Sequence, residues 1–71
     1  IKFALKGTSA ELTYLTVYDA LGREVEELVN RQLEPGTYEA DWDASAFTSG
    51  VYYYRLESSG YAETKKMVLI K

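Results

Sequence analysis

Clusters of turn-forming residues interrupt the sequence about every ten residues, and this spacing limits the chain to short elements of secondary structure. The clusters are "GTSAE" (7–11), "DALG" (19–22), "PG" (35–36), "ASAFTSG" (44–50) and "SSG" (58–60). The segments between them are rich in Thr, Tyr, Val and Leu, which favour strands. Short strands separated by turns at this spacing are typical of an antiparallel β-sandwich. We therefore predict a small all-β domain of six to seven strands.

Alternation of apolar and polar residues predicts which strand faces point to the core. In the first segment, Ile1, Phe3 and Leu5 alternate with small or charged residues. In "VYYYRLE" (51–57), the inward positions are Tyr52, Tyr54 and Leu56, and the outward positions are Val51, Tyr53 and Arg55. Residues 38–43 are predicted to continue one strand, with Tyr38, Ala40 and Trp42 inward and Glu39, Asp41 and Asp43 outward. Phe47, in the following loop, is expected to turn inward.

Two segments leave the prediction open. In "LTYLTVYD" (12–19) the alternation slips between Tyr14 and Leu15, which indicates a bulge or a change of sheet. In "REVEELVN" (23–30) the apolar residues also fit the spacing of a short helix. We favour a strand from Val25 to Val29 and keep the helix as the alternative. "DALG" itself matches a type I turn, with Asp19 first and Gly22 fourth.

The last segment, "YAETKKMVLIK" (61–71), carries apolar residues on both strand faces. Met67 and Leu69 fall on one face, and Val68 and Ile70 fall on the other. Such a strand is either covered on both sides or available to a partner. Its lysines either protect a sheet edge or belong to a tail that another protein recognises.

The composition removes several classes of function. The chain has 71 residues, no cysteine and no histidine, which excludes thiolate chemistry, cysteine-based zinc sites and the commonest general base. The formal charge of −3 argues against a nucleic-acid partner bound through phosphate neutralisation. No segment approaches the roughly 18 apolar residues of a membrane-spanning helix, so we expect no direct membrane insertion.

Two residue sets invite a chemical interpretation. Glu39, Asp41 and Asp43 line one strand face, but calcium needs six to eight oxygen ligands, and a solvated strand face is the simpler interpretation. Tyr52 to Tyr54 with Trp42 could form a platform for sugar, although aromatic residues also fill cores. We expect these rings to be core, with Tyr53 the most exposed. We predict no catalytic residue, no metal and no cofactor.

Four motifs occur in a fixed order: "VYDALGREV" (17–25), "PGTYEADWDAS" (35–45), "SGVYYYRLES" (49–58) and "TKKMVLIK" (64–71). Each is weak alone, but the series resembles the C-terminal sorting domain of cargo proteins of the type IX secretion system. The resemblance covers nearly the whole chain. It implies an immunoglobulin-like sandwich that acts as a secretion signal and has no catalysis of its own.

The resemblance also implies a route and partners. Family members form the last domain of secreted or cell-surface proteins in certain Gram-negative bacteria. Such cargo reaches the periplasm by an ordinary signal peptide and then the cell surface or the medium. The outer-membrane translocon and its shuttle protein recognise the sorting domain, and a sortase-like peptidase commonly removes it. Carried over motif by motif, the translocon-recognition residues are Pro35, Gly36, Tyr38, Gly50, Tyr52, Lys65, Lys66, Met67, Val68, Leu69, Ile70 and Lys71.

The chain departs from the family pattern at its beginning. Family domains usually start with an earlier segment, often containing Tyr-Pro-Asn-Pro, that supplies the first strand, and residues 1–71 do not contain it. We therefore expect residues 1–71 to form a single domain excised from a larger secreted precursor. Without the first strand, an open sheet edge would be free for strand addition, including an oligomer.

Two other functions fit parts of the pattern. The immunoglobulin-like domain of flagellar hook-capping proteins also shows a "WD…G…Y.YR" pattern, but such structural domains usually continue past the last strand. A carbohydrate-binding accessory domain of a surface hydrolase would need a row of exposed aromatic rings.

Overall fold

The computed structural model describes residues 1–58 and 60–71, and this part of the chain forms six strands and no helix. The strands are β1 (Lys2–Leu5), β2 (Glu11–Asp19), β3 (Glu24–Leu33), β4 (Gly36–Glu39), β5 (Gly50–Ser58) and β6 (Tyr61–Leu69). All paired strands are antiparallel. The prediction of an all-β chain with six strands is confirmed, and residues 25–29 are strand rather than helix. The described residues contain no helix of the length and apolarity that would cross a membrane.

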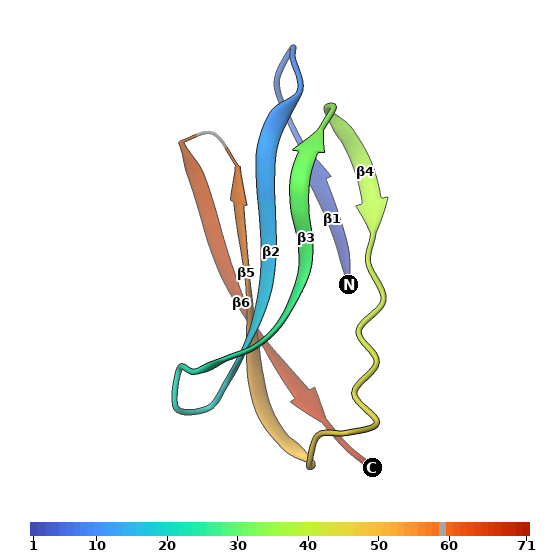
Figure 1. Cartoon of the computed structure of the whole chain (residues 1–71), viewed down its shortest axis with the longest axis vertical. Helices are drawn as coiled ribbons and strands as arrows, with labels where there is room; N and C mark the ends of the chain where they lie inside the picture. The colour runs from blue at the N-terminus through green and yellow to red at the C-terminus, as the bar shows by residue number, and fades with distance from the viewer. Residues whose placement is uncertain (59) are drawn as a thin grey trace.

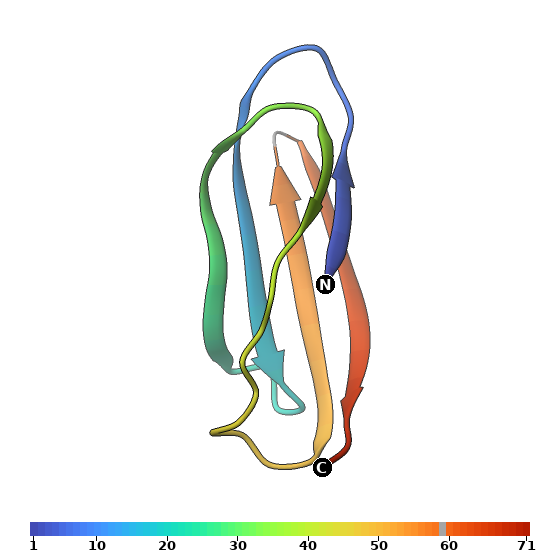
Figure 2. The same cartoon turned by 90° about the vertical axis from the view of Figure 1, so that its right-hand side faces the viewer.

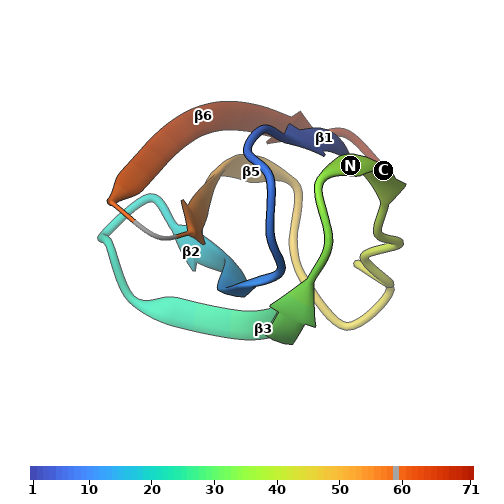
Figure 3. The same ribbon diagram turned by 90° about the horizontal axis from the view of Figure 1, so that it is seen from above.

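The strands form two sheets, one of two strands (β1-β4) and one of four strands in the order β3-β2-β5-β6. The smaller sheet lies over one face of the larger one (Figure 1; Figure 2). Seen from above, β1 and β4 lie across the interior from β2 and β3 (Figure 3). Side chains from both sheets fill it, and the core cluster is Phe3, Leu5, Leu15, Leu33 and Leu56. The result is a small β-sandwich.

β2 is regular, although its apolar pattern slips. Thr13, Leu15 and Val17 are all fully buried, and they occupy alternate positions on one face. Thr13 is accommodated because its hydroxyl donates to the carbonyl oxygen of Glu11 (3.0 Å) and hydrogen-bonds the hydroxyl of Ser58 (3.1 Å). The predicted irregularity exists in the pairing with β3, where the register shifts twice. The extra residues belong to β3, and β2 pairs with β5 without interruption.

Asp19 organises the turn between β2 and β3. The N–H of Gly22 donates to the Asp19 carbonyl oxygen (3.0 Å), and the N–H of Asp19 donates to the Arg23 carbonyl oxygen (2.9 Å). The Asp19 carboxylate accepts from the N–H groups of Leu21 (2.9 Å) and Arg23 (3.0 Å). These bonds fit the predicted turn with Asp first and Gly fourth. In the turn between β5 and β6, Gly60 has a φ of 72°, and Ser59 lies outside the described residues.

The strand predicted over residues 38–43 ends earlier, at Glu39. Ala40 still exchanges two backbone hydrogen bonds with Ile1, each 2.8 Å long. Residues 41–44 have no regular secondary structure. The predicted inward side chains remain half-buried, because Trp42 packs against Phe47 (ring centroids 5.4 Å apart) and Tyr52 (5.1 Å).

Candidate functional site

Residues 65–71 run along β6, which is an outer strand of the four-stranded sheet, and continue two residues beyond it. Met67 and Leu69 face the interior and are half-buried. Val68 is 61% exposed and Ile70 is 84% exposed. The structure therefore decides between the two predicted environments: this strand is covered on one face and open on the other.

The three lysines of this segment have different surroundings. Lys65 shares the inner face with Met67, and its ammonium group lies 3.1 Å from the Glu63 carboxylate. This hydrogen bond and charge raise the pKa of Lys65. Lys66 points from the outer face, opposite Tyr53 in the register.

Lys71 attaches the end of the segment to the loop between β4 and β5. Its backbone N–H donates to the Ser49 hydroxyl (3.0 Å), and its ammonium group donates to the Ser45 carbonyl oxygen (2.9 Å). Ser45 in turn is held by Asp43, whose carboxylate accepts from the Ser45 N–H (3.0 Å). This hydrogen bond lowers the pKa of Asp43, and the charge of Lys71 adds to the effect. Sequence patterns gave no signal for these anchors, because single serines in a loop match no motif.

The two Gly-x-Tyr sequences adopt the same local structure. Each glycine begins a strand at nearly the same positive φ, 154° in Gly36 and 155° in Gly50. Each tyrosine hydroxyl donates to a carbonyl oxygen four residues earlier: Tyr38 to Glu34 (2.6 Å) and Tyr52 to Thr48 (2.7 Å). The rings pack inward, Tyr38 on Phe3 and Tyr52 on Trp42. These contacts give both motifs a structural role at the start of a strand.

The predicted recognition residues therefore fall into separate regions. Pro35, Gly36 and Tyr38 lie at the start of β4, in the two-stranded sheet, whereas Gly50 and Tyr52 start β5. β5 lies beside β6, and Gly50 pairs with Leu69 while Tyr52 pairs with Met67. The second Gly-x-Tyr motif is thus adjacent to residues 65–71, and the first is in the other sheet.

The other candidate groups do not form a site. Glu39, Asp41 and Asp43 are exposed, and the described residues contain no cluster of three or more His, Cys, Asp or Glu side chains able to hold a metal. Trp42 and Tyr52 pack against each other, and Tyr53 is half-buried. The row of exposed rings needed for sugar binding is therefore not formed by these aromatic residues.

Comparison with protein families covers the chain from end to end. The model of the secretion system C-terminal sorting domain matches residues 1–71. The chain belongs to this family. A search of curated proteins and a search of solved structures give no match.

The sorting domain is a signal of the type IX secretion system that directs cargo proteins for export, and it is not an enzyme. It therefore acts through contacts with the secretion machinery. The functional site of a sorting domain is therefore a surface that binds another protein. The exposed face of β6 has the properties of such a surface.

Proposed function

We propose that residues 65–71 are the part of the sorting domain that the outer-membrane translocon and its shuttle protein grip. The observation that supports this is the placement of Val68 and Ile70, which are exposed on an outer strand while Met67 and Leu69 hold the strand to the core. An outer strand can pair with a partner through its backbone, and exposed apolar side chains then supply specificity.

The other predicted recognition residues have a supporting role in this proposal. Tyr52 is 7% exposed, which leaves little of its surface for a partner. Gly50 and Tyr52 shape the start of β5, on which β6 is paired. Pro35 and Gly36 are exposed and offer a second, smaller contact at the β3–β4 turn, beside Tyr38.

The wider setting follows from the same proposal. Residues 1–71 form a single domain of a larger secreted precursor. The cargo passes through the periplasm to the cell surface or the medium, where a sortase-like peptidase removes the sorting domain. Strand addition at an open edge, including an oligomer, is supported by the four outer strands that the two sheets present.

Export of a reporter tests the docking segment. A periplasm-targeted fluorescent protein is fused to residues 1–71 and expressed in a host that carries the type IX machinery. We expect the intact fusion to reach the surface or the medium, and deletion of residues 66–71 to retain it in the periplasm.

Point variants separate recognition from folding. Val68→Ser with Ile70→Ser removes only exposed apolar surface, so this variant should fold normally and still be retained in the periplasm. Leu12→Ser is the matched control, because Leu12 is also apolar and 46% exposed but lies on β2. Normal export of the folded double variant, or equal retention of the Leu12 control, would contradict the proposal. Circular dichroism and thermal unfolding of each variant establish that it is folded.

A further inference from the structure

The two-stranded sheet leaves one edge of β1 open over the inner face of β6. β1 pairs with β4 on one side, and within residues 1–58 and 60–71 no strand pairs with its other side. Residues Ile1 and Ala40 exchange both of their backbone hydrogen bonds. Because such pairs alternate along an antiparallel ladder, the backbone N–H and C=O groups of Lys2 and Ala4 point toward the open edge.

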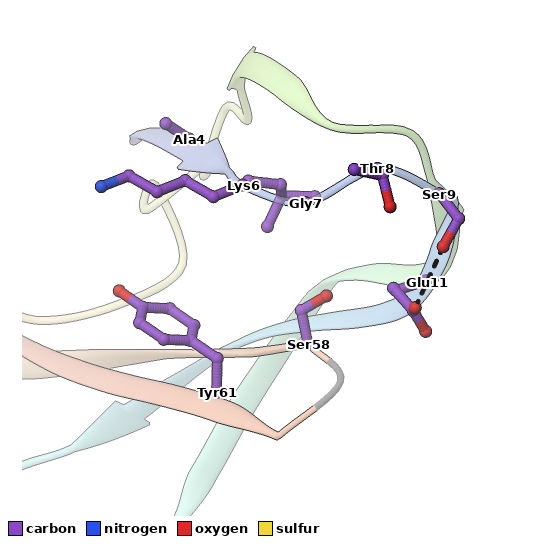
Figure 4. Close-up of a pocket in the computed structure, with 9 residues that line it drawn as sticks. Ala4, Lys6, Gly7, Thr8, Ser9, Glu11, Ser58 and Tyr61 are labelled. Carbon is purple, nitrogen blue, oxygen red and sulfur yellow. Dashed lines mark hydrogen bonds between the residues drawn. The ribbon is translucent and has the colours of Figure 1, made fainter.

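A groove runs along this edge. One part, of about 460 Å³, is lined on the β1 side by Lys2, Ala4 and Lys6 and on the opposite side by Tyr54, Leu56, Tyr61, Glu63 and Lys65. It continues past Lys6 into a second hollow of about 410 Å³ beneath the loop 7–9. Figure 4 shows this hollow, with Lys6 on the β1 side and the Tyr61 ring pointing from β6 into the space between them.

The first hollow carries more positive than negative charge, although the chain as a whole is acidic, and the second hollow adds Glu11 beside the shared Lys6. The first hollow has three lysines, Lys2, Lys6 and Lys65, and one acidic residue, Glu63. Glu63 is already engaged, since it accepts a hydrogen bond from the Tyr61 hydroxyl and lies 3.1 Å from the Lys65 ammonium group. Lys2 is only loosely paired, 4.0 Å from Glu39, with 81% of its side chain exposed. A partner with negative charge would complement this groove.

Pairing with a second copy through the same edge is disfavoured by these charges. Two antiparallel copies of β1 centred on Ala4 would place Lys2 of each copy opposite Lys6 of the other. Like charges directly opposite each other destabilise a strand pair. The acidic strand β3 of a second copy would also pair poorly with the β1 edge. Its register is interrupted twice by bulges, which disrupt a regular ladder of hydrogen bonds.

We propose that the β1 edge groove binds an extended acidic segment of another protein by strand addition. Of the docking segment 65–71, only Lys65 lines this groove. The acidic segment hydrogen-bonds the open backbone groups of Lys2 and Ala4. Its alternate side chains meet two environments. The side chains of the segment on the inner face would contact Tyr54, Leu56 and Tyr61, so apolar side chains fit there. The side chains on the outer face would lie beside Lys2 and Lys6, so acidic side chains fit there.

A capped, fluorescently labelled heptapeptide that alternates glutamate with valine is the probe. Fluorescence anisotropy should show saturable binding to residues 1–71 below about 1 mM, weakening as salt is added. The matched peptide with lysine in place of glutamate should not bind. Lys2→Glu with Lys6→Glu should weaken binding of the acidic peptide about fivefold to tenfold. Arg31→Glu, which reverses a single charge at an exposed position of β3, is the control and should leave binding nearly unchanged.

Amide hydrogen exchange measured by NMR locates the peptide. Binding should slow exchange of the Lys2 and Ala4 amides, whereas those of Phe3 and Leu5 are already paired with β4. Three outcomes would overturn the proposal: no saturable binding, equal binding of the lysine peptide, or protection confined to the outer edge of β6. Slow exchange at Lys2 and Ala4 without peptide, rising with protein concentration, would instead identify a second copy as the occupant and would likewise overturn it.

Discussion

The Tyr52 hydroxyl donates a 2.7 Å hydrogen bond to the carbonyl oxygen of Thr48, four residues earlier in the chain. The same arrangement joins Tyr38 to Glu34 at 2.6 Å. In each case the chain passes through a glycine with positive φ between the two bonded residues. The bond closes the corner at which an irregular segment becomes a strand, as a tyrosine corner does in other β-sandwiches. The repeated sequence Gly-x-Tyr therefore encodes one local structure twice.

Removing the Tyr52 hydroxyl should measure what this corner contributes. Tyr52→Phe keeps the ring against Trp42 and loses the hydrogen bond, which is partly buried. We expect the free energy of unfolding to fall by about 1 kcal/mol, measured by urea unfolding. Tyr38→Phe is the comparison. The Tyr38 hydrogen bond is exposed to solvent, so Tyr38→Phe should lower the free energy of unfolding by less than Tyr52→Phe does. An equal or larger decrease in Tyr38→Phe would contradict this account.

Gly50 should tolerate only a residue that accepts its backbone conformation. A Cβ added there would meet no atom within 4 Å, but φ is +155°, which L-residues rarely adopt. Gly50→Ala should therefore lower the free energy of unfolding by about 1–3 kcal/mol, measured by thermal unfolding. A chemically synthesised chain with D-alanine at position 50 is the control. It accepts positive φ and should be close to wild type, so an equal loss in both chains would point to a steric cause instead.

The alternating strands could be predicted from the sequence because burial follows a period of two wherever a strand has one covered face. Tyr52, Leu56, Phe3 and Leu5 are buried as their positions indicate. The pattern gave no single inward face for residues 12–19, because the alternation slips between Tyr14 and Leu15 and the buried face includes Thr13, a polar residue. Tertiary hydrogen bonds to Glu11 and Ser58 decide its position, and only the folded structure brings Ser58 close.

The docking segment was predictable in part. The pattern of Met67, Val68, Leu69 and Ile70 indicated a strand with two apolar faces, but it could not tell whether both were covered. The packing of the two sheets decides that, because only the face with Met67 and Leu69 turns to the interior, while Val68 on the other face is 61% exposed. The anchoring of Lys71 by Ser45 and Ser49 could not be predicted, since it joins residues 22 to 26 positions apart. The strand predicted to reach residue 43 was wrong after Glu39, because Trp42 packs on Phe47 and Tyr52 and strand propensity does not reveal such contacts.

Thr13 and Ser58 should be energetically coupled across β2 and β5. Thr13→Val keeps the shape of the side chain but removes the hydroxyl from a fully buried site, and we expect a loss of about 1 kcal/mol in the free energy of unfolding. Ser58→Ala removes the other partner. The double variant should lose less than the sum of the single variants, by about 0.5 kcal/mol or more. Strict additivity would show that the 3.1 Å contact contributes nothing to stability.

Asp19 should make stability depend on pH in the acid range. The Asp19 carboxylate is stabilised by the backbone N–H of Arg23, by the Arg23 guanidinium group and by the N–H of Leu21. These contacts lower the pKa of Asp19 from its usual 3.8. A group whose pKa is lower in the folded state contributes stability above its unfolded pKa. That contribution is lost as the pH falls from about 3.8 through the lower folded value.

Asp19→Asn retains an acceptor for the turn N–H groups but cannot titrate. Urea unfolding as a function of pH should therefore show a shallower acid decline in Asp19→Asn than in wild type, and NMR titration should place the Asp19 pKa below 3.8. Identical pH profiles for the two proteins would show that the Asp19 contacts do not distinguish the folded from the unfolded chain.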